Sequence, residues 1–129
     1  MYPAVSPAVS PELARIACWF SEDAAKPHWK LAVLAADSGQ RLKLFDLPPT
    51  VFPDTTLRWT PDGKAIAFIN NKDGASNIWI QPLEGGPSRA VTSFTWGQIY
   101  SFDWSKDGRL AYSRGLSTSD VVILRDIQN

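Results

Sequence analysis

Short apolar segments separated by turn residues run along most of this chain, and one group of them is especially regular. Thr55–Thr60 carries Trp59 next to its end, Pro61-Asp62-Gly63 has a turn composition, and Ala65–Asn70 is largely apolar again. Pro fixes φ at the start of a turn, Asp accepts backbone N–H bonds, and Gly adopts a left-handed conformation without steric cost. The pattern therefore predicts an antiparallel hairpin of fixed register.

Two further segments complete this unit. Asn77–Gln81 and Ser88–Thr92 follow Gly-containing turns of hairpin length. Because connections this short join neighbouring antiparallel strands, residues 55–94 are predicted to form one four-stranded meander.

The same phrase returns 45 residues later, where Trp104-Ser105-Lys106-Asp107-Gly108 repeats the order of Trp59-Thr60-Pro61-Asp62-Gly63. Strands are predicted over Ile99–Ser105, Arg109–Arg114 and Asp120–Arg125, in a unit of residues 98–129 without a fourth strand. Recurrence at this spacing indicates stacked modules. The shared structural positions are Trp59, Asp62, Gly63, Trp104, Asp107 and Gly108.

A degenerate copy covers residues 4–47, in which Lys30–Leu34 and Arg41–Phe45 align with the third and fourth strands. The segment Arg15–Phe20 has two interpretations. Ser10-Pro11-Glu12 is a typical helix start, and apolar residues follow at helical spacing. The alignment with the regular unit favours a strand instead, and both alternatives remain open at this stage.

The segment Tyr2–Val9 contains a Pro-Ala-Val-Ser tandem and is expected to be extended, either as a tether or as a weak edge strand. It is also a candidate to complete the last unit as an outermost strand, a place where missing N–H donors are tolerated.

Several predicted strands, such as Ile78-Trp79-Ile80, are apolar at consecutive positions, which indicates sheets covered on both faces. Together with Trp59–Lys64, Ile66-Ala67-Phe68 and the copy from Trp104, this segment resembles the WD-like repeat of TolB-type β-propellers. The resemblance implies an all-β fold of three antiparallel blades, half of a six-bladed ring. In multidomain bacterial proteins such propellers often follow a Ser/Thr kinase or winged-helix domain as the sensing or docking half.

The composition is that of a soluble globular protein, with 44% apolar and 20% charged residues. The 13 basic and 13 acidic residues cancel, which gives no field to attract nucleic acid or an anionic membrane. Cys18 is the single cysteine, so it forms no internal disulfide and is expected to be a small buried hydrophobe. No apolar stretch is long enough for a membrane span, and Met1–Ser10 lacks secretory features, which favours the cytoplasm if Met1 is the natural start.

No catalytic motif accompanies this pattern. Phosphate-binding loops and kinase signatures are absent, and Gly115–Ser119 fails the Gly-x-Ser-x-Gly elbow at its last position. The residues around Asp73 do not have EF-hand spacing. His28 is the single histidine and is expected in a surface or loop role. The sequence therefore predicts no catalytic residue, metal or cofactor.

An interaction surface is the remaining candidate site. Trp96 and Tyr100 lie on the connection between the second and third units, where binding residues tend to occur. Packing between units is the alternative role for both. The long connection 21–28, with His28 and the adjacent Trp29, is the second candidate.

Three functions fit these observations. The first is a non-catalytic module that docks a protein or small ligand within a larger bacterial protein. The second is an accessory domain of a kinase or peptidase whose catalytic part lies elsewhere. The third is a half-propeller that closes a ring as a homodimer, since three blades alone would leave two largely apolar outer faces.

Overall fold

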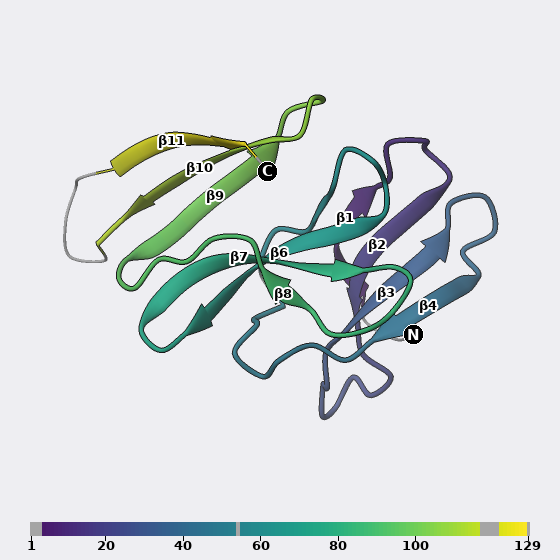
Figure 1. Cartoon of the computed structure of the whole chain (residues 1–129). Coiled ribbons are helices and arrows are strands. Elements are labelled where there is room, and N and C mark those ends of the chain that lie inside the picture. The colour runs from purple at the N-terminus through teal and green to yellow at the C-terminus, as the bar shows by residue number, and fades with distance from the viewer. Residues whose placement is uncertain (1–3, 54, 117–121, 129) are drawn as a thin grey trace.

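The computed structural model describes residues 4–53, 55–116 and 122–128, with only the backbone for residues 4, 5 and 122–128. In these residues eleven strands form three antiparallel sheets, and there is no helix. Sheet 1 has the order β1-β2-β3-β4, sheet 2 the order β5-β6-β7-β8, and sheet 3 the order β9-β10-β11. Figure 1 shows the sheets side by side in chain order, with sheet 2 in the middle. The strands are β1 (Ala4–Val9), β2 (Arg15–Phe20), β3 (Lys30–Ala35), β4 (Arg41–Phe45), β5 (Arg58–Trp59), β6 (Ala65–Lys72), β7 (Ala75–Pro82), β8 (Arg89–Ala90), β9 (Gln98–Trp104), β10 (Arg109–Gly115) and β11 (Val122–Gln128).

The prediction of a strand over Arg15–Phe20 is confirmed, and the helical alternative is wrong. Ser10 does not cap a helix. Its hydroxyl oxygen accepts the Arg15 N–H at 3.0 Å, and its own N–H donates to the Arg15 carbonyl at 2.9 Å. The apolar residues that fall at helical spacing belong instead to a strand, one face of which packs Ala17 and Trp19 against sheet 2.

The N-terminal segment is the edge strand of sheet 1, where Val9 pairs with Ile16. It is therefore neither a tether nor the completing strand of the last unit. Sheet 3 has three strands in the described residues, and its last strand begins at Val122. Asp120, the predicted start of that strand, lies outside the described residues.

The same turn closes the first hairpin of every sheet. Ser10, Thr60 and Ser105 each accept an N–H from the residue that begins the next strand, at 3.0, 3.1 and 3.0 Å. A residue with positive φ follows in each turn. It is glycine in two of them, whereas Leu13 adopts φ 64° in the first. The hydroxyl therefore defines the turn even where the glycine is missing.

Two strands of sheet 2 are shorter than the sequence pattern predicts. β5 covers Arg58–Trp59 and β8 covers Arg89–Ala90. Beyond β8, the Thr92 hydroxyl accepts the N–H of Ile78 at 2.9 Å. A side chain here replaces the next backbone partner, so the ladder ends although the segment stays attached.

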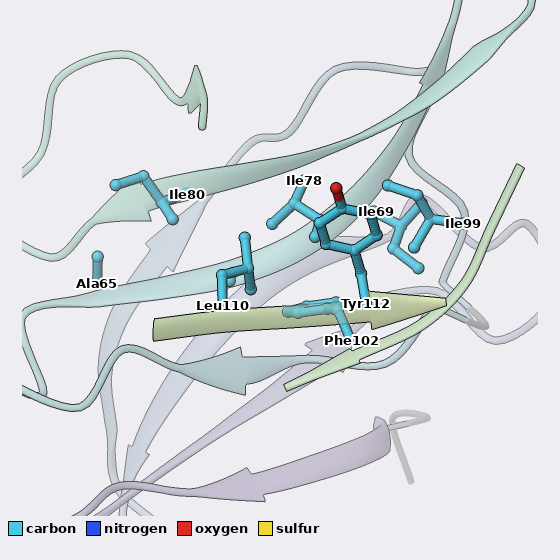
Figure 2. Packing of buried hydrophobic residues seen from close by; sticks show 9 residues of the cluster. Ala65, Ile69, Ile78, Ile80, Ile99, Phe102, Leu110 and Tyr112 are labelled. Carbon is cyan, nitrogen blue, oxygen red and sulfur yellow. The ribbon is translucent and has the colours of Figure 1, made fainter. Parts of the chain in front are cut away.

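The hydrophobic core lies between the sheets rather than within one of them. Trp19 of sheet 1 and Phe68 of sheet 2 are buried in the first cluster. Figure 2 shows the second cluster, in which Phe102, Leu110 and Tyr112 of sheet 3 pack toward β6 and β7 of sheet 2. Both faces of sheet 2 are thus covered.

At both boundaries, bulky side chains of one sheet lie against alanines of the sheet before it. Sheet 2 presents Trp59, Ile66 and Phe68 to sheet 1, and sheet 3 presents Trp104, Leu110 and Tyr112 to sheet 2. The small residues that receive these bulky groups include Ala17 on sheet 1 and Ala65 and Ala67 on sheet 2. The receiving faces also carry large residues, since sheet 1 contributes Trp19 and Leu31 to the first boundary and sheet 2 contributes Ile69 and Ile78 to the second.

The two outer faces differ, contrary to the expectation that both are largely apolar. Val9, on the outer face of sheet 1, is 54% exposed, and its partner Ile16 is half-buried. On the outer face of sheet 3, the described positions include Ser101 and Ser113, whose hydroxyl oxygens lie 3.0 Å apart. At the described positions this face is therefore more polar than the outer face of sheet 1.

Replacement of Leu13 by glycine is expected to stabilise the protein. Leu13 is 74% exposed and holds a positive φ, so the side chain contributes little packing while the backbone is strained. Removing this strain should raise the free energy of unfolding by about 1 kcal/mol, measured by urea denaturation. Leu13→Ala, which removes the side chain but keeps a Cβ, is the control. Equal stability of the two variants would contradict the prediction.

Candidate interaction surface

The Asn77 side chain is a main attachment of the connection between β8 and β9 to β7. Asn77 accepts the Phe94 N–H at 2.6 Å and donates to the Phe94 carbonyl at 3.0 Å. The Thr92 hydroxyl also donates to its amide oxygen, at 2.8 Å. This bracing fixes the direction in which the aromatic residues of the connection leave the sheet.

Arg114 of β10 lies between two aromatic rings of this connection. Its guanidinium carbon is 3.9 Å from the Phe94 ring centre and 4.2 Å from the Trp96 ring centre. One terminal N–H₂ group donates to the Trp96 carbonyl, and the residue is 6% exposed. Cation–π contacts with two rings offset part of the cost of burying this charge.

Glycine is required at position 97 for this arrangement. Gly97 has φ 86°, and a Cβ there would lie 3.1 Å from both the Arg114 Nη2 atom and the Gly115 carbonyl oxygen. The connection can approach the buried guanidinium only because no side chain intervenes.

The bracing leaves Trp96 and Tyr100 exposed by 49% and 51%. The Tyr100 hydroxyl donates to the carbonyl of Leu116, which is itself 48% exposed. Rigid, half-exposed aromatic side chains are typical anchors of protein interfaces, since ordering them on binding costs little entropy. This arrangement suits non-covalent recognition.

The second candidate region lies on sheet 1 and is built differently. His28 is exposed, with its Nε2 atom 3.8 Å from the Asp46 carboxylate. Trp29 is half-buried and packs against the cluster between sheets 1 and 2. Trp96 lies on the connection between β8 and β9, whereas His28 and Trp29 lie on the connection between β2 and β3. The prediction that Tyr100 lies on a connection is wrong, because this residue is part of β9. Trp29 contributes to packing.

The repeated motif residues have structural surroundings. The Trp59 indole N–H donates to the Ala8 carbonyl at 2.8 Å across the boundary between sheets 1 and 2. The corresponding N–H of Trp104 is buried without a partner among the described residues. Asp62 accepts the Lys64 N–H at 2.9 Å, and Asp107 accepts the Ser105 hydroxyl.

The first turn contains an ion pair that the sequence motif does not predict. The Arg15 Nε donates to the Glu12 carboxylate at 2.5 Å, and this bond lowers the pKa of the Glu12 carboxyl from 4.5 to about 2. In the second turn, the Thr60 hydroxyl and then the Lys64 N–H lower the pKa of Asp62. Both turn carboxylates are therefore ionised at neutral pH.

Groups that could support other chemistry are sparse in the part of the chain that the structure describes. No three His, Cys, Asp or Glu residues there come together in a way that could hold a metal ion. Cys18 is buried, as expected, and burial raises the pKa of its thiol. The described residues form no helix that is long and apolar enough to cross a membrane.

Sequence reasoning missed the residues that shape the surface, above all Arg114, Asn77 and Gly97. The sequence contains one signal for Arg114. It follows Tyr112 at a spacing of two residues, so both lie on the same face of the strand, and an arginine is unexpected on a face that packs on the core.

With this architecture described, comparison with known proteins defines its class. The chain is 38% identical over 107 residues to Tricorn protease homolog 1 of Streptomyces coelicolor, which covers 77% of this chain and 10% of that protein. It is 40% identical over 55 residues to the uncharacterized peptidase YuxL of Bacillus subtilis, which covers 42% of this chain and 8% of that protein. No family model matches the chain. The chain thus spans about a tenth of these curated relatives.

Solved structures place the fold more closely. TolB of Acinetobacter baumannii superimposes with a TM-score of 0.69 at 22% identity, over 95% of this chain and 29% of that one. An acylaminoacyl peptidase of Pyrococcus horikoshii gives a TM-score of 0.58 at 20% identity, over 93% of this chain and 18% of that one. The three sheets are β-propeller blades. Their fold is that of part of a TolB-like propeller.

The Glu12 carboxyl is expected to titrate far below the usual range of a glutamate. Because its pKa is lowered in the folded state, the ion pair stabilises the fold above the unfolded pKa near 4.5 and loses this effect as the pH falls toward 2. A ¹³C NMR titration of the side-chain carboxyl would measure the midpoint. In Arg15→Ala the midpoint should rise toward 4.5, and an unchanged midpoint would contradict the assignment.

Replacement of Arg114 by lysine is expected to lower the free energy of unfolding by about 2 kcal/mol, because an ammonium group lacks the planar stacking and forked donors of a guanidinium. Urea denaturation would measure the loss. Arg109→Lys, at an exposed position of the same strand, is the matched control and should change stability by at most about 0.5 kcal/mol. Similar effects at the two positions would refute the structural role of the ring contacts.

Proposed function

We propose that this chain is a non-catalytic segment of a β-propeller in a larger bacterial protein, where it provides a docking surface beside a peptidase domain. The observation that carries the proposal is the 38% identity over 107 residues to a protease homolog of which the chain matches 10%. The peptidase context is favoured over the kinase or winged-helix context because two curated relatives are named as peptidases.

The exposed aromatic pair supports a docking role. Trp96 projects from a connection that Asn77 and Arg114 hold in place, and Tyr100 projects from the start of β9, which follows it. A surface whose geometry is already fixed before binding loses little entropy when a partner arrives. The partner we propose is therefore another protein or domain that covers these two rings.

The residues on the outer faces of sheets 1 and 3 also bear on how the ring is completed. In sheet 1, Arg15 lies over the ring of Trp59, with its guanidinium carbon 4.7 Å from the ring centre. Arg109 begins β10 as Arg15 begins β2, so it suits a following blade that carries tryptophan. A second copy of this chain would instead present Val9, which stands where sheet 2 has Trp59. Further blades of a longer ring therefore fit better than homodimeric closure.

Taken alone, the 129-residue chain is expected to associate through the apolar outer face of sheet 1, because that face includes Val9 and the half-buried Ile16. Light scattering at micromolar concentration should give a mass above that of one chain. Ile16→Lys should reduce the mass, whereas Ala111→Lys, on the outer face of sheet 3, should not.

This pair of variants separates the two modes of association. Closure of a two-fold ring uses both outer faces, so it predicts that Ala111→Lys lowers the mass as much as Ile16→Lys does. A folded monomer of the unsubstituted chain would contradict the prediction that the outer face of sheet 1 causes association. The coding sequence on either side gives the context directly, since an in-frame peptidase domain supports the proposal and an in-frame kinase domain overturns that part of it.

A further inference from the structure

One position of the repeated turn differs between the sheets in a way that leaves a groove. The turn hydroxyls of Ser10 and Thr60 accept the N–H groups of Arg15 and Ala65, so these two residues are structural equivalents. Arg109 holds the same position in sheet 3. Sheet 2 thus has alanine where both of its neighbours have arginine.

Arg15 fills the boundary between sheets 1 and 2 at this level. Its guanidinium carbon is 4.7 Å from the Trp59 ring centre, and its Nη2 donates to the Gly63 carbonyl at 3.0 Å. Its Nε donates to the Glu12 carboxylate at 2.5 Å. With this cover, Trp59 is 7% exposed. The guanidinium therefore meets three groups: a tryptophan face, a turn carbonyl and a turn carboxylate.

The boundary between sheets 2 and 3 repeats these groups without the arginine. Trp104 corresponds to Trp59, because they pair with Leu110 and Ile66 in the same register. Gly108 corresponds to Gly63, because each donates its N–H to the carbonyl of the turn Ser or Thr. A hollow of about 1270 Å³ opens here, lined by Trp104, Gly108, Ala65 and Asp62 among others, and it extends as far as Arg15 at the first boundary. Trp104 remains half-buried, rather than buried like Trp59.

We propose that this groove binds an arginine side chain from a peptide segment of a partner protein. The guanidinium stacks on Trp104, donates to the Gly108 carbonyl, and pairs with the Asp62 carboxylate, which stands at the turn position of Glu12. Arginine suits this set better than lysine because its planar donors can stack and hydrogen bond together. The hollow exceeds the volume of one side chain, which favours a peptide over a free amino acid.

The charges around the groove add a condition on the peptide. Lys64, Arg89 and Lys106 are exposed at its lining, beside the carboxylates of Glu84 and Asp107. Asp107 already lies 3.6 Å from the Arg109 guanidinium. The basic groups would repel a uniformly basic peptide, so the segment carries a single arginine among neutral or acidic residues.

The test uses the 129-residue chain and the peptide acetyl-Gly-Arg-Gly-amide, followed by ¹H–¹⁵N NMR. We expect saturable shifts at the Trp104 indole N–H and the Gly108 amide. Acetyl-Gly-Lys-Gly-amide should bind about tenfold more weakly, because an ammonium group lacks the planar, forked donors that stack on the indole and hydrogen bond at the same time. Equal binding of the two peptides would overturn the proposal, and free arginine binding as tightly as the capped peptide would overturn its peptide part.

Two variants locate the site. Ala65→Arg places the missing side chain in the chain itself, so it should abolish peptide binding and raise the melting temperature, while Ala65→Ser should leave binding intact. Asp62→Asn, at an exposed turn position, should weaken binding several-fold without unfolding the protein. If Ala65→Arg fails to fold, Asp62→Asn decides the question. Unchanged affinity in a folded Ala65→Arg or in Asp62→Asn would overturn the proposal.

Discussion

The packing of one apolar sheet face against the next is the interaction on which the rest of this structure depends. Each sheet is a single layer, so no sheet has a core of its own, and apolar surface is removed from water only at the boundaries. Phe68 and Trp19 are essentially inaccessible at the first boundary, and Leu110 at the second. At about 25 cal/mol per Å² of buried apolar surface, such boundaries supply the main favourable term of folding. They also explain why strands with consecutive apolar residues are stable here.

The turns convert this packing into a repeated geometry. A turn hydroxyl satisfies the first N–H of the next strand, so register does not depend on the residues around it. This explains how the degenerate first unit keeps the fold although Leu13 replaces glycine and Val9 replaces tryptophan. Local chemistry at Ser10, rather than helix propensity, decides the structure of the segment that follows it. Burial of Ala17 and Trp19 against sheet 2 then reinforces the strand.

Much of the fold was therefore predictable from the sequence. The turn chemistry and the recurrence of the Trp-Ser/Thr-x-Asp-Gly phrase indicated the antiparallel units, and the alignment predicted β2 correctly. Side-chain contacts between distant segments were not predictable, because the sequence pattern carries no information about which residues meet across separations of 18 to 48 positions. The burial of Arg114 against Phe94 and Trp96 belongs to this class, as does the contact of Arg15 with Trp59. The polar outer face of sheet 3, with Ser101 and Ser113, was missed because the apolar pattern of the buried strands was extended to every sheet face.

Differences between the copies contain more functional information than their common motif does. Because Thr60 satisfies the Ala65 N–H regardless of the side chain at that position, the residue there can vary without altering the turn. Arginine closes one boundary over Trp59, whereas alanine leaves the next one open beside Trp104. The same reasoning applies to the connection at Trp96, since Asn77 and Arg114 hold the backbone and free the ring to face outward. In such a scaffold, the same hydrogen bonds satisfy the backbone in each copy. Individual side chains can therefore vary and be used for recognition.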